Sequence, residues 1–105
     1  MSGKVTLYAA TVESVELPIK VNSDPTATVP YFALSATSAV APGTFFAGTW
    51  VSSYDSTTDL TTARTPTLGS AGSMVIASGS DYSLWVKVTL LGEVAQWPVA
   101  TIHCP

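Results

Sequence analysis

The sequence predicts an all-β fold, and three observations lead to that prediction. Apolar and polar residues alternate in several short segments, and β-branched residues are common in each of them. No segment carries apolar residues at the i, i+3, i+4 and i+7 spacing over the length that a helix needs. The chain has 105 residues, the size of one ordinary domain. We therefore expect a single two-sheet β-sandwich domain over residues 1–105.

The first two strands are expected at residues 4–10 and 15–21. Residues 4–10 alternate between an apolar face and a face that includes Tyr8, which is typical of a half-buried strand. Residues 15–21 alternate more sharply and carry Pro18 on the polar face. Because proline cannot donate a ladder hydrogen bond, we expect an edge position or a locally unpaired site there. Turn residues at 22–26 end this strand.

The middle of the chain predicts one clear strand, one central strand and one loop. Residues 29–35 alternate, with Phe32 on the apolar face. Residues 44–52 are apolar on both faces, which favours a strand in the centre of a sheet. Residues 53–64 are rich in serine, threonine and aspartate, and we expect a long exposed loop there with at most a short edge strand.

The last third of the chain predicts a short strand, a long strand and a final strand. Residues 74–77 form a short apolar run between two turn-rich segments. Residues 82–90 alternate most regularly, and Trp85 falls on the face opposite the aliphatic side chains. We expect a turn or an irregular connection at residues 92–96 and a last strand at residues 97–104.

About seven short strands in a chain of this length indicate an immunoglobulin-like two-sheet sandwich. Trp50 would supply the buried indole of such a core. Tyr82 stands where a tyrosine corner is expected, at the entry to the penultimate strand. Simple core filling is the alternative for both aromatic residues, and it predicts the same burial.

Charge and cysteine content exclude several function classes. The net charge is −3, and the few basic residues are scattered, so we expect no direct contact with nucleic acid. The 13 serines and 15 threonines supply neutral polar surface for the exposed strand faces. We expect no membrane span and no signal peptide, because no unbroken apolar run is long enough. Cys104 is the only cysteine, so no intrachain disulfide can form.

No group of residues in the sequence points to catalysis, a metal or a cofactor. His103, the only histidine, has no carboxylate near it in sequence, and no serine lies in a strained nucleophile turn, so we expect no enzyme activity. His103 and Cys104 are adjacent, so in a strand they point to opposite faces and cannot share a metal ion. Asp55 and Asp59 lack the dense oxygen-ligand pattern of a calcium loop. Glycine spacing typical of a phosphate loop is absent as well.

Three aromatic residues are the candidate contact sites. Trp85 is expected on an outer face, Trp97 at the entrance of the last strand, and Tyr8 on the outer side of the first strand. An outer tryptophan indicates partner contact or cover by a loop. We favour a protein partner, because tryptophan is enriched at protein interfaces, over a sugar ring stacked on Trp85 or Trp97.

Motifs spread over nearly the whole chain carry a resemblance to a known family. They are Val15-Glu16-Leu17-Pro18-Ile19, Asp24-Pro25-Thr26, Val29, Phe32, Trp50, Gly79-Ser80-Asp81-Tyr82-Ser83-Leu84-Trp85-Val86-Lys87-Val88, Pro98-Val99 and Ile102. In this order they resemble small virion-associated structural proteins of tailed phages of actinobacteria. The sequence departs from the family at Lys87, where arginine is usual, and at residues 92–96, where Asp-x-Pro-Glu is more usual.

The resemblance implies a non-enzymatic structural or assembly protein of the virion, in the capsid decoration, the head–tail region or the tail. Its partners would be other virion proteins, such as capsid or connector subunits, together with symmetric copies of itself. It would be synthesised in the cytoplasm of the bacterial host and reside in the virion. The alternative is a carbohydrate-binding or host-surface-binding β-sandwich module.

Overall fold

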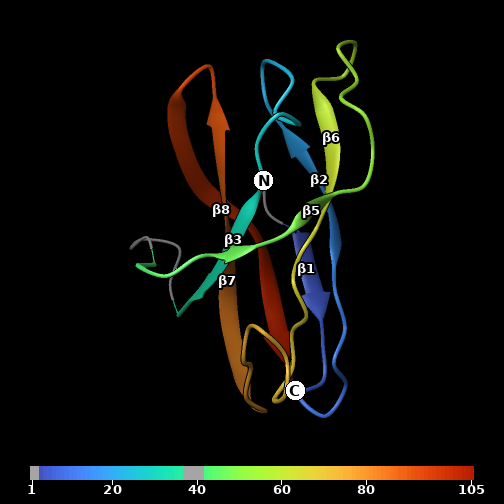
Figure 1. The fold of residues 1–105 in the computed structure, drawn as a ribbon. Helices are drawn as coiled ribbons and strands as arrows, with labels where there is room; N and C mark the ends of the chain where they lie inside the picture. Colours follow the sequence, from blue (N-terminus) through green and yellow to red (C-terminus); the bar gives the residue numbers. More distant parts are fainter. Residues whose placement is uncertain (1–2, 37–41) are drawn as a thin grey trace.

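The computed structural model describes residues 3–36 and 42–105, which form eight strands in two sheets packed together (Figure 1). The strands are β1 (Gly3–Thr6), β2 (Glu16–Lys20), β3 (Tyr31–Ser35), β4 (Phe46–Ala47), β5 (Thr49–Trp50), β6 (Leu60–Arg64), β7 (Ser80–Leu90) and β8 (Glu93–Cys104). No helix occurs within these residues. The expected all-β class with two packed sheets is confirmed.

The larger sheet has five strands in the order β1-β8-β7-β3-β4. Its centre is the antiparallel hairpin of β7 and β8, the two longest strands of the molecule. β1 pairs in parallel with the edge of β8 that faces away from β7, and Val5 lies opposite Ile102. The hydrogen bond from the Leu7 amide to the His103 carbonyl, 2.9 Å long, continues this pairing beyond β1.

The smaller sheet has three antiparallel strands in the order β2-β6-β5. β2 pairs with β6 alone, so Pro18 lies on an edge strand, as its missing N–H predicts. β6 is the central strand, and its Thr61 and Ala63 are buried. The expectation of a long exposed loop at residues 53–64 is therefore wrong for 60–64. A threonine and an alanine face the interior there, and neither residue type stands out as apolar core in a sequence pattern.

Residues 44–52 do not form one central strand, so that expectation is also wrong. β4 lies at the edge of the larger sheet and β5 at the edge of the smaller one. Between them is Gly48, whose amide donates to the Pro30 carbonyl at 2.7 Å. The chain crosses from one sheet to the other at this glycine. Apolar residues on both faces of the segment reflect that crossing, because β4 and β5 pack in different layers.

A tight turn, and not an irregular connection, joins β7 to β8. The two residues between the strands, Leu91 and Gly92, have φ values of 51° and 82°. Positive φ at both central positions is the geometry of a type I′ turn, which matches the twist of the flanking strands. The expected irregular stretch at 92–96 is wrong, because β8 begins at Glu93.

Residues 74–77 form no strand, contrary to expectation, but they contribute to the interior. Met74 makes a single bridge to Leu68, and both Met74 and Ile76 are buried. The burial of Met74 and Ile76 accounts for their apolar side chains, whereas Val75 between them is exposed. It has no neighbouring strand with which to continue a ladder.

The core lies between the two sheets. The inward face of β7 is the one predicted, with Leu84, Val86 and Val88 fully buried. Phe32 on β3 is the largest fully buried side chain among the described residues. Trp50 packs against this core but is half-buried, so the expectation of a buried indole is met only in part. The hydroxyl of Tyr82, at the start of β7, accepts a hydrogen bond from the Ala77 amide at 3.0 Å.

Candidate functional site

Trp85 is not an exposed contact residue. Its cross-strand neighbour on β3 is Ala33, and both are buried outside the core that the two sheets enclose, with Trp85 only 7% exposed. The expectation of an outward tryptophan is right about the face and wrong about its exposure. An outer tryptophan indicates either contact with a partner or cover by a loop of the same chain. The burial of Trp85 within this chain favours cover. The indole N–H of Trp85 finds no hydrogen-bond partner among the described residues.

Trp97 faces the core side of β8 because of a bulge. The pairing shifts between Leu84, which lies opposite Ala100, and Trp85, which lies opposite Pro98, so Val99 is the extra residue. Trp97 consequently pairs with Val86 and packs partly against the core. Strict alternation from Ala100 would have placed Trp97 on the outer face. What remains exposed of its ring borders a small groove beside Pro18, Lys20, Pro98 and Val99.

Tyr8 is exposed, as expected, just after β1. It is one of several large apolar or aromatic side chains on the surface. The others are Val12, Val29, Tyr31, Phe46, Val51, Val75, Leu91 and Val94. They are spread over both sheets and their connections, so exposure alone does not single out Tyr8.

The end of the β7–β8 hairpin, residues 90–94, carries the most exposed large apolar side chain in the described part of the chain. Leu91 is 94% exposed and Val94 is 64% exposed. We call residues 90–94 the hairpin tip. In Figure 1 the tip extends to one end of the molecule, away from the chain's carboxyl end. Leu91 holds a left-handed backbone, a conformation that costs a leucine about 1–2 kcal/mol. A strained backbone and an exposed apolar side chain thus coincide at one residue.

Lys87 lies on the outer face of the larger sheet among aromatic rings. Its Nζ is 4.4 Å from the centre of the Phe45 ring and 5.4 Å from that of Tyr31. Both distances fall within the range of cation–π attraction. An arginine at this position could make the same contact.

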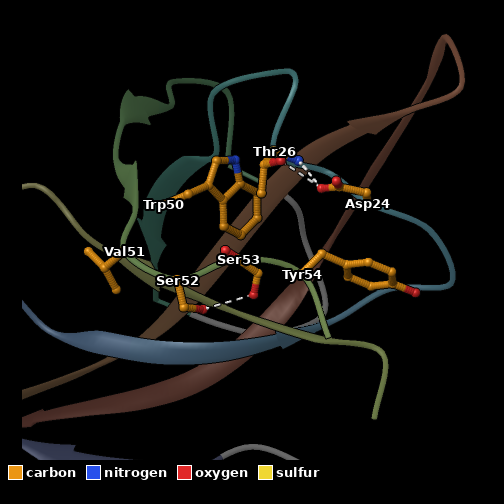
Figure 2. Close-up of a pocket in the computed structure, with 7 residues that line it drawn as sticks. All are labelled: Asp24, Thr26, Trp50, Val51, Ser52, Ser53 and Tyr54. Carbon is orange, nitrogen blue, oxygen red and sulfur yellow. Dashed lines mark hydrogen bonds between the residues drawn. The ribbon is translucent and has the colours of Figure 1, made fainter. Parts of the chain in front are cut away.

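A second surface feature is an open pocket between the β2–β3 connection and the segment after β5 (Figure 2). It is a shallow hollow, wide open to solvent, with a volume of about 490 Å³, and it is lined by Asp24, Thr26, Trp50, Val51, Ser52, Ser53 and Tyr54. We call it the Trp50 pocket. Figure 2 shows Trp50 beside Thr26, the Asp24 carboxylate pointing toward Thr26, and the Tyr54 hydroxyl pointing away from Trp50.

Hydrogen bonds fix three of the side chains that line the Trp50 pocket. The indole N–H of Trp50 donates to the Thr28 carbonyl at 2.7 Å. The Asp24 carboxylate accepts from the Thr26 amide at 2.9 Å and from the Thr26 hydroxyl at 2.7 Å. The Tyr54 hydroxyl donates to the Asp59 carboxylate at 2.6 Å. The aromatic rings and the Asp24 carboxylate are therefore held in place before any ligand arrives.

Two pKa shifts describe the charges around this pocket. The hydroxyl and amide of Thr26 stabilise the ionised form of Asp24 and lower its pKa. The hydrogen bond to Asp59 raises the pKa of Tyr54 to about 12, and burial and the nearby charges of Asp59, Asp24 and Asp55 act in the same direction. At neutral pH Tyr54 is thus an uncharged donor beside ionised carboxylates.

The structure gives His103 a carboxylate partner that sequence distance concealed. The antiparallel pairing of β7 and β8 places Asp81 opposite His103, with His103 Nδ1 2.5 Å from Asp81 Oδ1. A Ser-His-Asp triad also needs a hydroxyl bonded to the other ring nitrogen. No such bond is present among the described residues. The pair is accounted for as a cross-strand contact on the outer face of the sheet.

Within residues 3–36 and 42–105, no three histidine, cysteine, aspartate or glutamate side chains are grouped so that they could hold a metal ion. The same part of the chain has no helix of the length and hydropathy needed to cross a bilayer.

Comparison with known proteins adds no relative: no family model, no curated protein and no solved structure matches this chain.

Proposed function

We propose that the two-sheet sandwich is immunoglobulin-like. In immunoglobulin domains, strands B, E and D are neighbours in one sheet, and strands C, F and G are neighbours in the other. The order β2-β6-β5 matches B-E-D, and the order β3-β7-β8 matches C-F-G. With these assignments, strands B to G also follow one another along the chain as they do in an immunoglobulin domain. β4 then corresponds to the strand that variable-type domains add next to C. Phe32 on β3 takes the place of the core tryptophan of strand C.

The hydrogen bond at Tyr82 supports this assignment. A tyrosine corner places a tyrosine near the start of strand F, with its hydroxyl bonded to backbone a few residues upstream. Tyr82 is the third residue of β7, and its hydroxyl bonds the Ala77 amide.

Removing this hydroxyl should destabilise the fold without opening the core. We expect Tyr82→Phe to lower the free energy of unfolding by about 1 kcal/mol, because one intramolecular hydrogen bond is lost and the ring remains. Chemical denaturation of both proteins measures this difference. Tyr8→Phe is the matched control, since Tyr8 is exposed and its hydroxyl has no partner among the described residues. Equal stability of Tyr82→Phe and Tyr8→Phe would contradict a role for the corner.

We propose further that the protein is a non-enzymatic structural component of a phage virion that acts through contacts with other proteins. The motif resemblance suggests the virion, and the hairpin tip is the observation that carries the protein-contact function. The projecting turn has exposed apolar side chains and a strained backbone, and both lower the stability of the free protein. Burial of these side chains by a partner would offset that cost.

The chemistry of the hairpin tip favours a protein over a membrane or a sugar. The only charge in residues 90–94 is that of Glu93, whereas attachment to anionic lipids uses lysine and arginine. No aromatic ring is present at the tip to stack on a sugar. An apolar socket on a neighbouring virion subunit suits an aliphatic side chain such as Leu91.

The carbohydrate alternative depended on Trp85 and Trp97 as platforms for sugar rings. Burial of Trp85 removes one of them, and Trp97 keeps only part of its ring at the surface. This makes the protein-contact function the better supported of the two.

The substitution Leu91→Asn separates folding from binding. Asparagine adopts left-handed backbone more readily than leucine, so we expect the variant to be more stable by about 1 kcal/mol. Loss of the buried leucine in the complex should weaken attachment to virions by roughly tenfold or more. Purified protein is added to particles assembled without it, and the bound fraction is measured by co-sedimentation.

Val75→Asn serves as the control, because Val75 is as exposed as Val94 but lies before the start of β7, far from the tip. It should bind particles as the unmodified protein does. If the unmodified protein neither co-sediments with particles nor is detected in virions by mass spectrometry, the virion proposal fails. If Leu91→Asn binds as well as the unmodified protein, the tip is not the contact.

A further inference from the structure

We propose that the Trp50 pocket binds a positively charged group, an alkylammonium or a guanidinium, between the Trp50 indole and the Asp24 carboxylate. This inference is independent of the virion proposal. It rests on the shape of the pocket, the fixed aromatic ring and the uncompensated negative charge around it.

The first step is the position of the indole. Trp50 is half-buried, and its N–H is already bonded to the Thr28 carbonyl. The ring edge therefore has no free donor to offer a ligand, and the part of the ring that lines the pocket interacts through its π-system. Indole is the best cation–π partner among the side chains. Since the hydrogen bond holds the ring, little conformational entropy is lost on binding.

The second step is the carboxylate. Both hydrogen bonds from Thr26 go to Oδ1 of Asp24, which leaves Oδ2 with no partner among the described residues. In Figure 2 the carboxylate faces Thr26, which is drawn between Asp24 and Trp50. A ligand cation with an N–H group can thus contact the ring and donate a charge-assisted hydrogen bond to Oδ2.

The third step is the charge of the surroundings. No lysine, arginine or histidine lines the pocket. Asp24 is the one charged side chain among the lining residues. The charges of Asp55 and Asp59 act on the Tyr54 hydroxyl, which points away from Trp50 (Figure 2). The field at the pocket is therefore that of the Asp24 carboxylate. This field repels phosphate and carboxylate ligands, gives no advantage to a neutral sugar, and favours a cation.

The volume is compatible with such a ligand. About 490 Å³ lies within the range of small-molecule sites, and the pocket is open enough for the end of a lysine or arginine side chain to enter from another molecule. A free amine and a side chain of a protein present the same chemistry, and the experiment distinguishes them.

The test is a titration followed by ¹H–¹⁵N NMR, with the indole N–H signal of Trp50 as the local reporter. The probes are tetramethylammonium, N-acetyl-lysine methylamide and N-acetyl-arginine methylamide, each raised to about 50 mM so that weak binding is detected. Methyl glucoside and acetate are the neutral and anionic comparisons. We expect saturable shifts of residues that line the pocket with at least one cation and none with acetate. Stronger binding of the two capped amino acids than of tetramethylammonium would indicate a protein side chain as the source.

Asp24→Asn is the decisive variant, because the amide oxygen can keep the Thr26 hydrogen bonds while the charge is lost. We expect it to weaken cation binding by about fivefold, the upper range for one exposed charge pair. Asp81→Asn, on the outer face of the other sheet, should leave binding unchanged. The proposal is overturned if no cation shifts these signals, if methyl glucoside shifts them equally, or if Asp24→Asn binds the cations as the unmodified protein does.

Discussion

Replacing Phe32 by alanine is expected to lower the free energy of unfolding by about 4 kcal/mol, the largest loss from any single truncation in this core. Phe32 is 0% exposed and lies on β3, between β7 and β4. Removing a fully buried phenylalanine forfeits its transfer free energy and leaves a cavity, and such changes cost about 3–5 kcal/mol. A small domain has only about 5–15 kcal/mol of stability, so the variant should be close to unfolding at 37 °C.

Phe46→Ala is the matched control for this prediction. Phe46 pairs with Phe32 across β3 and β4, but it is 39% exposed. We expect a loss of about 1 kcal/mol, because much of its surface stays in water in the folded protein. Urea denaturation, monitored by tryptophan fluorescence, measures both variants. Similar losses at the two positions would show that Phe32 is not the centre of the core.

Introducing a methyl group at Gly48 is expected to cost about 3 kcal/mol. A Cβ atom built there would lie 2.6 Å from the Arg64 carbonyl oxygen and 2.6 Å from Cε2 of Phe32. The first of these atoms is backbone of β6 and the second belongs to a fully buried ring, so neither can move away freely. The site at which the chain crosses between the sheets therefore requires glycine for space.

Gly43→Ala provides the comparison, because a Cβ at Gly43 would meet no atom within 4 Å. We expect that variant to change stability by less than about 0.5 kcal/mol. The double variant Phe32→Ala with Gly48→Ala should lose less than the sum of the two single losses, since one of the two collisions disappears. A Gly48→Ala protein as stable as Gly43→Ala would mean that the two sheets do not approach each other at Gly48 as closely as described.

The strands whose residues alternate cleanly were predictable from sequence. Residues 15–21 and 82–90 became β2 and β7, and the inward face of β7 is the predicted one. Pro18 identified an edge strand because its missing N–H is a local property of the residue. Alternation and the missing N–H of proline are properties of a few neighbouring residues. The structure they predict therefore depends little on contacts with distant segments.

What failed depended on contacts between distant segments. Gly48 divides an apolar run between two sheets, and only its close approach to Phe32 and Arg64 explains why. β6 is central because β2 and β5 flank it, although its buried side chains are small or hydroxylated. Neither relation can be found within a short window of sequence.

The candidate site was the least predictable part. The bulge at Val99 turns Trp97 toward the core, and nothing in the local sequence specifies an extra residue there. The Trp50 pocket joins Asp24 to Trp50 and Tyr54 across two connections, so no motif describes it. Leu91 was detectable in principle, because a glycine follows it between two alternating segments, which is compatible with a two-residue hairpin turn.

The parallel pairing of β1 with β8 affects the order in which the molecule assembles and comes apart. Val5 pairs with Ile102, and almost the entire sequence lies between them. The intervening polypeptide must therefore become compact before β1 and β8 can pair. We expect the β1–β8 pairing to form last during folding, because the entropy of closing a long loop is lost before the non-local contacts form. Under a pulling force on the amino-terminal residues, β1 should separate from β8 first, while the β7–β8 hairpin remains paired.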